Sequence, residues 1–190
     1  MSAAIARPRQ QRFRPLRPAV LALGSNLGDR ETTIREAVAE LDAIPGVHVD
    51  ALSPLVETPA LTLEGIDLAA PAYLNAVVTI HTALDAYSLL DAANAIENAH
   101  GRVRDERWGS RTLDVDIIDF DGREFSDDRL TLPHPRAWER AFVLAPWLAI
   151  DPDATIPGRG RADVALAATT DTVWQYPRHA ETGQTEGVEE

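Results

Sequence analysis

The sequence predicts a single mixed domain of the α+β class, and three observations support this. First, 190 residues, 45% of them hydrophobic, suffice for one substantial core but not for two full domains. Second, some segments show the alternating polarity of strands and others the apolar spacing of helices. Third, these segments follow one another as strand, helix, strand, strand, helix, strand. We expect residues 19–176 to form this domain, with a basic, disordered arm at 1–18 and an acidic, disordered tail at 177–190.

The first strand and the first helix follow the arm. Residues 19–23 form a continuous apolar run, typical of a buried strand, that ends at Gly24. Asp29 can cap the helix that follows, whose apolar stripe contains Ile34 and Leu41. A Pro-Gly pair ends this helix.

The second and third strands are separated by a loop. Residues 47–56 predict a strand with a proline break, and residues 60–71 form a loop long enough to be a wall or lid over a site. The third strand, residues 73–80, places Tyr73 and Asn75 on one face. The Asn75 amide could read the edge of a heterocyclic ring, and a structural hydrogen bond to a loop is the alternative.

The second helix is predicted over residues 85–100, where an apolar stripe runs up to a capping Gly101. Asn94 and Glu97 are three residues apart and share another stripe. Glu97 is either a simple exposed charge or a group that orients one of the arginines that follow.

The last strand of this series carries two carboxylates. Residues 112–120 alternate in polarity, so side chains two apart share a face at a spacing of roughly 7 Å. Asp114 and Asp116 therefore point the same way, and Ile118 and Phe120 follow on the same face. Paired carboxylates repel and are costly to desolvate, which favours a bound cation. Mg²⁺, which takes one or two protein carboxylates together with water and phosphate oxygens, fits best. A solvated strand face is the alternative.

An arginine-rich segment immediately precedes this strand. Arg102, Arg104, Arg107 and Arg111 can supply guanidinium forks for phosphate groups. Trp108, in their midst, predicts a flap that closes over a ligand, with packing onto the protein's own surface as the alternative.

The segment after the carboxylates contains further polar candidates. Residues 129–136 are extended, and two prolines hold His134 in a rigid, non-helical context. Residues 137–149 predict a helix interrupted near its proline, with Arg140 and Phe142 at the exposed start.

Composition excludes several classes of function. All 18 basic residues are arginine, so neither a Walker A loop nor a protein-kinase ATP site, which both need lysine, can operate. A net charge of −12 argues against general binding to nucleic acid or anionic membranes. The longest apolar run, residues 141–150, is about half of what a spanning helix needs. The chain has no cysteine, which suits a reducing cytoplasm.

Six motifs in this order resemble the 6-hydroxymethyl-7,8-dihydropterin pyrophosphokinase family of folate biosynthesis. The resemblance covers residues 20–150. Its motifs are Gly24-Ser25-Asn26, Glu57-Thr58-Pro59, Tyr73-Leu74-Asn75-Ala76, Gly101-Arg102-Val103-Arg104, Arg107-Trp108-Gly109-Ser110-Arg111-Thr112-Leu113-Asp114-Val115-Asp116, and Pro133-His134-Pro135-Arg136 continuing to Arg140-Ala141-Phe142. The family's fold is a three-layer α-β-α arrangement on a ferredoxin-like β-α-β-β-α-β core with a mainly antiparallel sheet, which matches the order of elements above.

The resemblance also implies the site residues. It implies that Asp114 and Asp116 bind two Mg²⁺ ions and that Arg102 and Arg111 are the catalytic phosphate clamp. The residues implied for ATP are Asn94, Arg104, Ile117, Arg129, Thr131 and His134. Those implied for the pterin are Thr58, Pro59, Tyr73, Asn75, Trp108 and Phe142, with Glu97 and Arg140 in supporting positions.

The implied reaction is attack of the pterin hydroxymethyl oxygen on the β-phosphorus of ATP, which releases AMP. The expected partners are these two small molecules, and the expected protein is a cytoplasmic monomer.

Two alternative functions belong to other classes of protein. Another two-metal phosphoryl-transfer enzyme would need more metal carboxylates than this pair. A ferredoxin-like binding module for RNA would need exposed strand aromatics and a basic field, and the third strand has one aromatic residue, Tyr73.

Overall fold

The computed structural model describes residues 15–62, 65–67, 71–101 and 112–177. Within them, four α-helices and one short 3-10 helix accompany the strands. The helices are α1 (Arg30–Asp42), α2 (Ala86–Ala99), η1 (Ala137–Glu139), α3 (Ala141–Ile150) and α4 (Ala162–Ala167). The longer strands are β1 (Arg17–Ser25), β2 (Val47–Leu52), β6 (Tyr73–Thr82) and β7 (Asp114–Phe120). The shorter strands are β3 (Val56–Thr58), β4 (Ala60–Thr62), β5 (Gly65–Asp67), β8 (Phe125–Ser126), β9 (Thr131–Leu132), β10 (Thr155–Ile156), β11 (Gly160–Arg161) and β12 (Trp174–Gln175).

The main sheet has six strands, and its neighbours run antiparallel. Its path is β12-β3-β6-β1-β7, and β2 also pairs with β6 beyond the β3 segment. β1 and β6 form the centre, and β7 lies at one edge. This mixed α and β architecture with an antiparallel sheet agrees with the fold class expected from the sequence.

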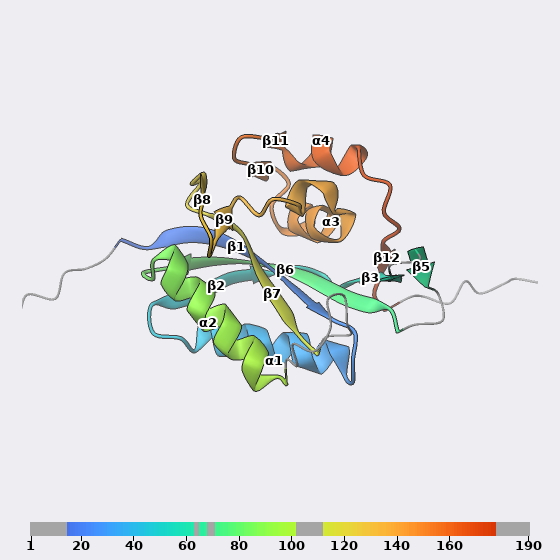
Figure 1. Ribbon diagram of the computed structural model, residues 1–190, viewed down its shortest axis with the longest axis horizontal. Helices are drawn as coiled ribbons and strands as arrows, with labels where there is room; N and C mark the ends of the chain where they lie inside the picture. Colours follow the sequence, from blue (N-terminus) through green and yellow to red (C-terminus); the bar gives the residue numbers. More distant parts are fainter. Residues whose placement is uncertain (1–14, 63–64, 68–70, 102–111, 178–190) are drawn as a thin grey trace, which may run out of the picture.

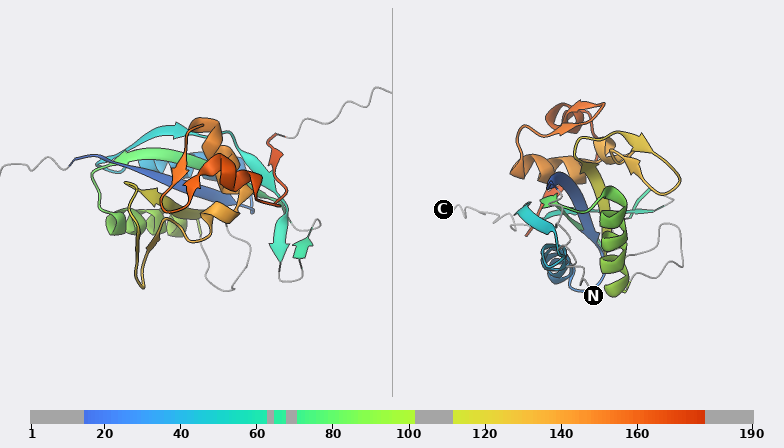
Figure 2. Two further views of the ribbon diagram at one scale, coloured as in Figure 1. Left: turned by 90° about the horizontal axis from the view of Figure 1, so that it is seen from above. Right: turned by 90° about the vertical axis from the view of Figure 1, so that its left-hand side faces the viewer.

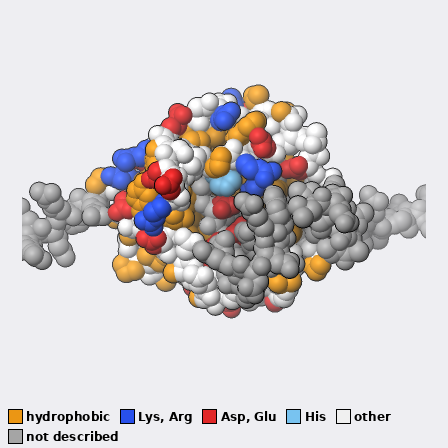
Figure 3. Space-filling model, viewed as in Figure 1, with side chains coloured by type: hydrophobic (Ala, Val, Ile, Leu, Met, Phe, Trp, Pro, Cys, Tyr) orange, Lys and Arg blue, Asp and Glu red, His pale blue; other side chains and the backbone are white. Residues whose placement is uncertain are grey.

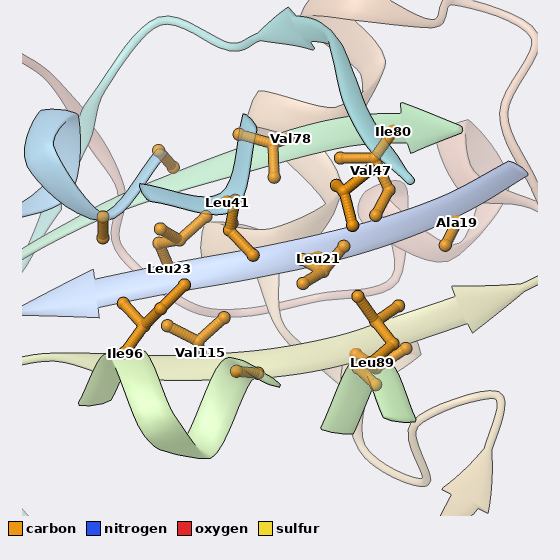
Figure 4. Close-up of a cluster of buried hydrophobic side chains, with 14 of the residues drawn as sticks. Ala19, Leu21, Leu23, Leu41, Val47, Val78, Ile80, Leu89, Ile96 and Val115 are labelled. Atoms are coloured by element: carbon orange, nitrogen blue, oxygen red, sulfur yellow. The ribbon is translucent and has the colours of Figure 1, made fainter. Parts of the chain in front are cut away.

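Helices cover both faces of the sheet (Figures 1 and 2). α1 and α2 pack against one face over a core that includes Leu21, Leu41 and Leu89 (Figure 4). α3 and α4 lie over the other face, above a second core that includes Val77 and Trp147. We call these the α1 face and the α3 face. Burial of apolar side chains on both faces explains why β1 and β6 read as nearly continuous apolar runs.

Each long helix begins directly after an aspartate that caps it: Asp29, as expected, and Asp85, the first residue of the predicted second helix. The Asp29 side chain accepts a hydrogen bond from the Thr32 backbone N–H at 3.1 Å. The Asp85 side chain does the same for Ser88 at 2.9 Å. Each bond satisfies a donor that the first helical turn leaves unpaired. The two predicted helices are therefore confirmed.

β7 contains a bulge that the alternation of the sequence did not reveal. Leu21 of β1 pairs with Ile117, but Val20 pairs with Asp119, so Ile118 is the additional residue. Ile118 belongs to the core under α3, whereas Phe120 belongs to the core over α1 and α2. The expectation that Phe120 shares the face of the carboxylates is wrong, because the bulge reverses the alternation.

Two other segments differ from the sequence-based expectation. The expected loop at residues 60–71 contains the β4–β5 hairpin. The helix expected at 137–149 is broken at Arg140, whose backbone is extended (φ −115°, ψ 106°), whereas α3 continues through Pro146. Proline removes one helical hydrogen bond, and tertiary packing of the apolar α3 tolerates this loss. No helix in the described residues is long and apolar enough to cross a membrane.

Candidate active site

A row of three residues crosses the α3 face of the sheet. Asn75 of β6 lies opposite Gly24 of β1, and Gly24 lies opposite Asp114 of β7. Residues directly opposite each other on neighbouring strands share a face. Tyr73 and Asp116, two residues away from Asn75 and Asp114 along their strands, share it too. A glycine at the centre leaves open space between the amide and the carboxylate, and a methyl group on Gly24 would lie 3.2 Å from Asn75 Oδ1.

A histidine and an arginine approach the second carboxylate. His134 Nε2 and Arg140 Nη1 each lie 3.9 Å from Asp116 Oδ2. The Asp116 side chain is 39% exposed and is therefore accessible to a ligand. On the face shown in Figure 3, a histidine lies beside basic and acidic side chains. Opposite charges are thus gathered at one accessible carboxylate.

Burial sets the charge of His134. It is the main cause that lowers the pKa of this imidazole, and Arg140 and Arg136 lower it further, against the attraction of Asp116 and Asp114. His134 Nδ1 accepts a hydrogen bond from the Arg136 backbone N–H at 3.2 Å. A neutral imidazole with this acceptor carries its proton on Nε2, the atom that faces Asp116. Burial and the Arg136 contact thus favour the neutral imidazole with its N–H at Nε2.

Burial also lowers the pKa of the Arg140 guanidinium, against the attraction of Asp116. Arginine nevertheless stays charged in proteins. Its guanidinium carbon lies 5.5 Å from the centre of the Phe142 ring, at the start of α3. This cation–π contact joins the phenyl ring to the arginine that approaches Asp116.

A cavity of about 320 Å³ adjoins this cluster, between α2, the outer edge of β7 and residues 127–135. Its volume is within the range of small-molecule sites. Of the six residues expected at the ATP site, Ile117, Arg129, Thr131 and His134 line it. The other lining residues are Leu90, Val115, Asp116, Asp127, Asp128, Leu130 and Pro135.

The arginine of this cavity is held from α2. Arg129 Nη2 donates to Asp91 Oδ1 at 2.7 Å, and the guanidinium lies 5.3 Å from the centre of the Tyr87 ring. The Tyr87 hydroxyl in turn donates to the Asp127 carboxylate. Asp127 accepts from the backbone N–H of Arg129 at 2.8 Å, which stabilises the turn. These contacts orient the Arg129 side chain in the absence of a bound phosphate.

Asn94 does not line the cavity. Its side chain donates to the Leu90 carbonyl oxygen at 2.9 Å, one turn earlier on α2. Leu90 is a lining residue that sequence reasoning missed, although its position four residues before Asn94 could have found it. Asp127 was missed as well, because its place at the cavity depends on the turn between β8 and β9.

The residues expected at the pterin form a second group on the α3 face. Asn75 Nδ2 donates to Thr58 Oγ1 at 3.1 Å, and Thr58 lies opposite Tyr73. Asn75 therefore makes a structural hydrogen bond, although its partner belongs to strand β3 and not to a loop as expected. Its Oδ1 lies beside the open space at Gly24. Pro59 follows Thr58 directly at the end of β3.

Glu97 is not an exposed charge. It is 2% exposed, and its Oε1 accepts a hydrogen bond from the Val115 backbone N–H at 2.8 Å. Val115 belongs to the edge strand β7. Through Glu97, helix α2 thus provides a hydrogen-bond acceptor for the edge strand β7, which carries the two carboxylates.

Several expected site residues lie outside the described part of the chain. They are Arg102, Arg104, Trp108 and Arg111. In the described part, no three histidine, cysteine, aspartate or glutamate residues form a cluster that could hold a metal ion. Two half-exposed carboxylates on one face remain the oxygen donors, and Mg²⁺ commonly uses one or two protein carboxylates and completes its shell with water and phosphates. The donor set therefore fits Mg²⁺.

The fold and the site together define a class of mixed α and β proteins that hold paired carboxylates and cationic groups over an antiparallel sheet. A sequence model of the 7,8-dihydro-6-hydroxymethylpterin-pyrophosphokinase (HPPK) family matches residues 20–152. The chain belongs to this family, which confirms the resemblance seen in the sequence.

Curated relatives carry the same activity in their names. The 2-amino-4-hydroxy-6-hydroxymethyldihydropteridine pyrophosphokinase of Methylorubrum extorquens is 44% identical over 140 residues, 74% of this chain and 86% of the relative. The protein of the same name from Bacillus subtilis is 46% identical over 128 residues, 67% of this chain and 74% of the relative.

Solved structures support the fold. An HPPK-DHPS of Plasmodium falciparum has a TM-score of 0.62 and 13% identity, over 83% of this chain. This chain spans 46% of the length of that protein. At such low identity the likeness concerns the fold alone.

Proposed function

We propose that this protein transfers diphosphate from ATP to 6-hydroxymethyl-7,8-dihydropterin, giving AMP and the pterin diphosphate in folate biosynthesis. The observation that carries the proposal is the row of Asn75, Gly24 and Asp114. It sets an amide for a heterocycle next to carboxylates for a metal–phosphate group on one face. Family membership independently supports the same reaction.

The cavity beside β7 is the proposed ATP site. Leu90 and Ile117 offer apolar surface for a base, and Arg129, Thr131 and His134 offer hydrogen-bond donors for ribose and phosphates. Asn94, one turn from Leu90, and Arg104 complete the proposed set. Because the chain has no lysine, arginine is the permanently charged side chain that can hold the phosphates, together with metal, backbone and neutral donors.

Asp114 and Asp116 would hold two Mg²⁺ ions. When bound, these ions supply charge neutralisation for the phosphates and a common template for both substrates. Asp116 also attracts His134 and Arg140, so the same cluster can orient phosphate oxygens by hydrogen bonds. We assign Arg102 and Arg111 to the phosphate clamp on the family resemblance.

The pterin slot would lie over Gly24. Tyr73 and Phe142 would contact the faces of the ring, and Asn75 with the Thr58-Pro59 backbone would read its amide edge. The buried Asn75–Thr58 pair supports this, because a preorganised amide loses little entropy on binding. Trp108 is the proposed flap, and Glu97 and Arg140 support the site through Val115 and Asp116.

The reaction then needs positioning more than side-chain chemistry. The hydroxymethyl oxygen attacks the β-phosphorus and releases its proton to water. The bond from that phosphorus to the oxygen bridging the α-phosphorus breaks, and AMP leaves with the bridging oxygen. The β- and γ-phosphates move together to the pterin. Arg140 and His134 would donate hydrogen bonds to phosphate oxygens near Asp116, and alignment of the two substrates would supply most of the acceleration.

Membership of the HPPK family also supports a more detailed description of the fold and of the domain. We infer a three-layer, ferredoxin-like core, supported by the chain order β1, α1, β2, β6, α2, β7 and the spatial order β2-β6-β1-β7. We propose a single catalytic domain at residues 19–176 that acts as a cytoplasmic monomer on small molecules, without nucleic acid or membrane.

The nucleotide product tests this function. The protein is mixed with Mg²⁺, ATP and the reduced pterin alcohol, and nucleotides are separated by chromatography. AMP should form in equal amount to the pterin diphosphate. Formation of ADP, or of no product, would contradict the proposal.

One substitution tests the metal site in the same assay. Asp116→Ala should lower kcat by at least about 100-fold while the fold is retained, because a half-exposed carboxylate contributes little to the core. Near-normal turnover of a folded Asp116→Ala protein would contradict the assignment of this residue to Mg²⁺.

A further inference from the structure

Arg30 makes a connection that the proposed reaction does not use. It is the first residue of α1, and its Nη1 donates to Glu57 Oε1 at 2.8 Å and to the Ala72 carbonyl oxygen at 2.6 Å. The Arg30 and Glu57 side chains are 24% and 10% exposed. A single guanidinium nitrogen thus joins β3 to the residue just before β6.

The two joined residues stand next to the proposed pterin slot. Glu57 directly precedes Thr58, and Ala72 directly precedes Tyr73. Thr58 and Tyr73 lie opposite each other in the β3–β6 ladder. Arg30 therefore binds each chain segment one residue before Thr58 and Tyr73, the pair proposed to contact the pterin ring.

This ladder has few contacts of its own to define its geometry. Three residue pairs, Val56–Asn75, Glu57–Leu74 and Thr58–Tyr73, make up the whole β3–β6 pairing. Short ladders are readily displaced, because each residue pair contributes only a fraction of the pairing energy. A cation that bridges both strands restricts their relative shift.

Arg30 acts from the face opposite the proposed slot. Glu57 lies opposite Leu74, which belongs to the core of the α1 face. Thr58 and Tyr73 therefore present their side chains to the α3 face. Because Arg30 reaches the sheet from α1, it would not touch the pterin.

We propose that Arg30, through Glu57 and the Ala72 carbonyl, is a positioning residue for the pterin slot. This inference rests on the proposed function. Loss of the guanidinium removes the cation beside a buried carboxylate and frees the Ala72 carbonyl, so Thr58 and Tyr73 lose their common anchor. The nucleotide cavity beside β7 lies at the other edge of the sheet and shares none of these residues.

The test compares Arg30→Ala with a matched control on the same helix. Arg35 forms an exposed ion pair with Glu31 at 2.8 Å, so Arg35→Ala removes an arginine and an ion pair from α1 without touching β3. Initial rates are measured against each substrate in turn, and the Tm of every variant is recorded. Arg30→Ala should raise the KM for the pterin by about 10-fold and change the KM for ATP by less than about 2-fold. Arg35→Ala should leave both unchanged.

Two further variants keep the test decisive if Arg30→Ala fails to fold. Arg30→Lys retains the charge and one donor group, and Glu57→Gln retains an acceptor without charge. Each should raise the pterin KM by less than Arg30→Ala does, again without a matching rise for ATP.

The contrary outcomes separate this inference from the proposed function. A folded Arg30→Ala with an unchanged pterin KM, or with equal rises for both substrates, would overturn the positioning role while wild-type AMP formation stands. If all folded Arg30 and Glu57 variants behaved like Arg35→Ala, the role would likewise fail. Absence of AMP with the wild type would instead defeat the function itself.

Discussion

At the scale of single residues, Gly24 shows how an absent side chain shapes the candidate site. Its place between Asn75 and Asp114 requires no unusual backbone angle, so the benefit of glycine here is space. The polar groups on both sides can then face the same ligand. This distinguishes Gly24 from the turn glycines Gly28 and Gly122, whose φ angles are positive.

A Gly24→Ala substitution tests this role. The added methyl group would lie 3.2 Å from Asn75 Oδ1 and would occupy the proposed pterin slot. We expect the kcat/KM for the pterin to fall by at least about 10-fold, with the Tm within about 3 °C of wild type. Steady-state kinetics and thermal unfolding measure both, and an unaltered kcat/KM would show that the slot lies elsewhere.

Asp119 carries a stability cost that depends on pH. Burial raises the pKa of this carboxyl, although the Gly122 and Phe120 backbone N–H groups oppose the rise. Its Oδ1 is buried and makes no hydrogen bond. An acid whose pKa is raised on folding favours the folded state while protonated. Stability is therefore lost as pH rises from the unfolded pKa, roughly 3.9, through the raised folded pKa.

Asp119→Asn should remove this cost. The amide oxygen can still accept from Gly122, so we expect a gain of about 0.5 kcal/mol at pH 7, after allowing for solvent screening, or about 1–2 °C in Tm. The gain should disappear below about pH 4, where the wild-type carboxyl is protonated in both states. Thermal unfolding of both proteins between about pH 4 and pH 7 provides the measurement. A difference in Tm between variant and wild type that grew as the pH fell would contradict this explanation.

At the scale of elements, the edge strand β7 depends on groups outside the sheet. Its outer side is bonded by the Glu97 side chain from α2 and by the His134 backbone N–H, which donates to the Ile118 carbonyl at 2.9 Å. The bulge at Ile118 lets the first half of the strand present carboxylates and the second half present apolar residues to both cores. The contacts from Glu97 and His134 thus cover the outer edge of β7 and fix the orientation of the strand.

Glu97→Ala is expected to destabilise the protein by about 1–3 kcal/mol, because the buried Val115 N–H loses its acceptor. Glu97→Gln keeps an acceptor oxygen and should cost less. Urea denaturation midpoints of the two variants provide the measurement. Equal loss in both variants would show that the charge of Glu97, and not its hydrogen bond to Val115, supports the strand.

At the scale of the whole molecule, charge is divided between the chain's beginning and the rest. The first 18 residues contain five arginines and no acid, within a chain of net charge −12. β1 begins at Arg17, so the expected boundary of the basic arm at residue 18 lies inside this strand. Residues 1–14 lie outside the described part of the structure.

Removal of residues 1–14 should leave kcat and both KM values within about twofold, because terminal segments seldom contribute to a site built on a central sheet. The truncation spares β1, whose pairing with β6 and β7 holds Gly24 in place. Kinetics of the truncated and full-length proteins are compared at the same ionic strength. A large loss would show that the arm belongs to the site.

Much of this protein could be read from its amino-acid sequence. A continuous apolar run located β1, and β6 was located as a largely apolar segment, because burial on both faces leaves few polar positions. The regular spacing of apolar residues located β7 and both long helices. The pairing of Asp114 with Asp116 follows from the two-residue period of a strand. The order of six motifs also indicated the family, which the comparisons confirm.

Only the tertiary structure decided which residues meet across the chain. The opposition of Gly24 to Asn75 and Asp114, the contact of Glu97 with Val115, and the bridge from Arg30 to Glu57 join residues distant in sequence. Local patterns carry no register between strands, and a bulge such as that at Ile118 shifts it without any periodic signal. The chemical types of the site residues could therefore be predicted from the sequence. Only the pairing of the strands in the sheet determined which of these residues lie together in one site.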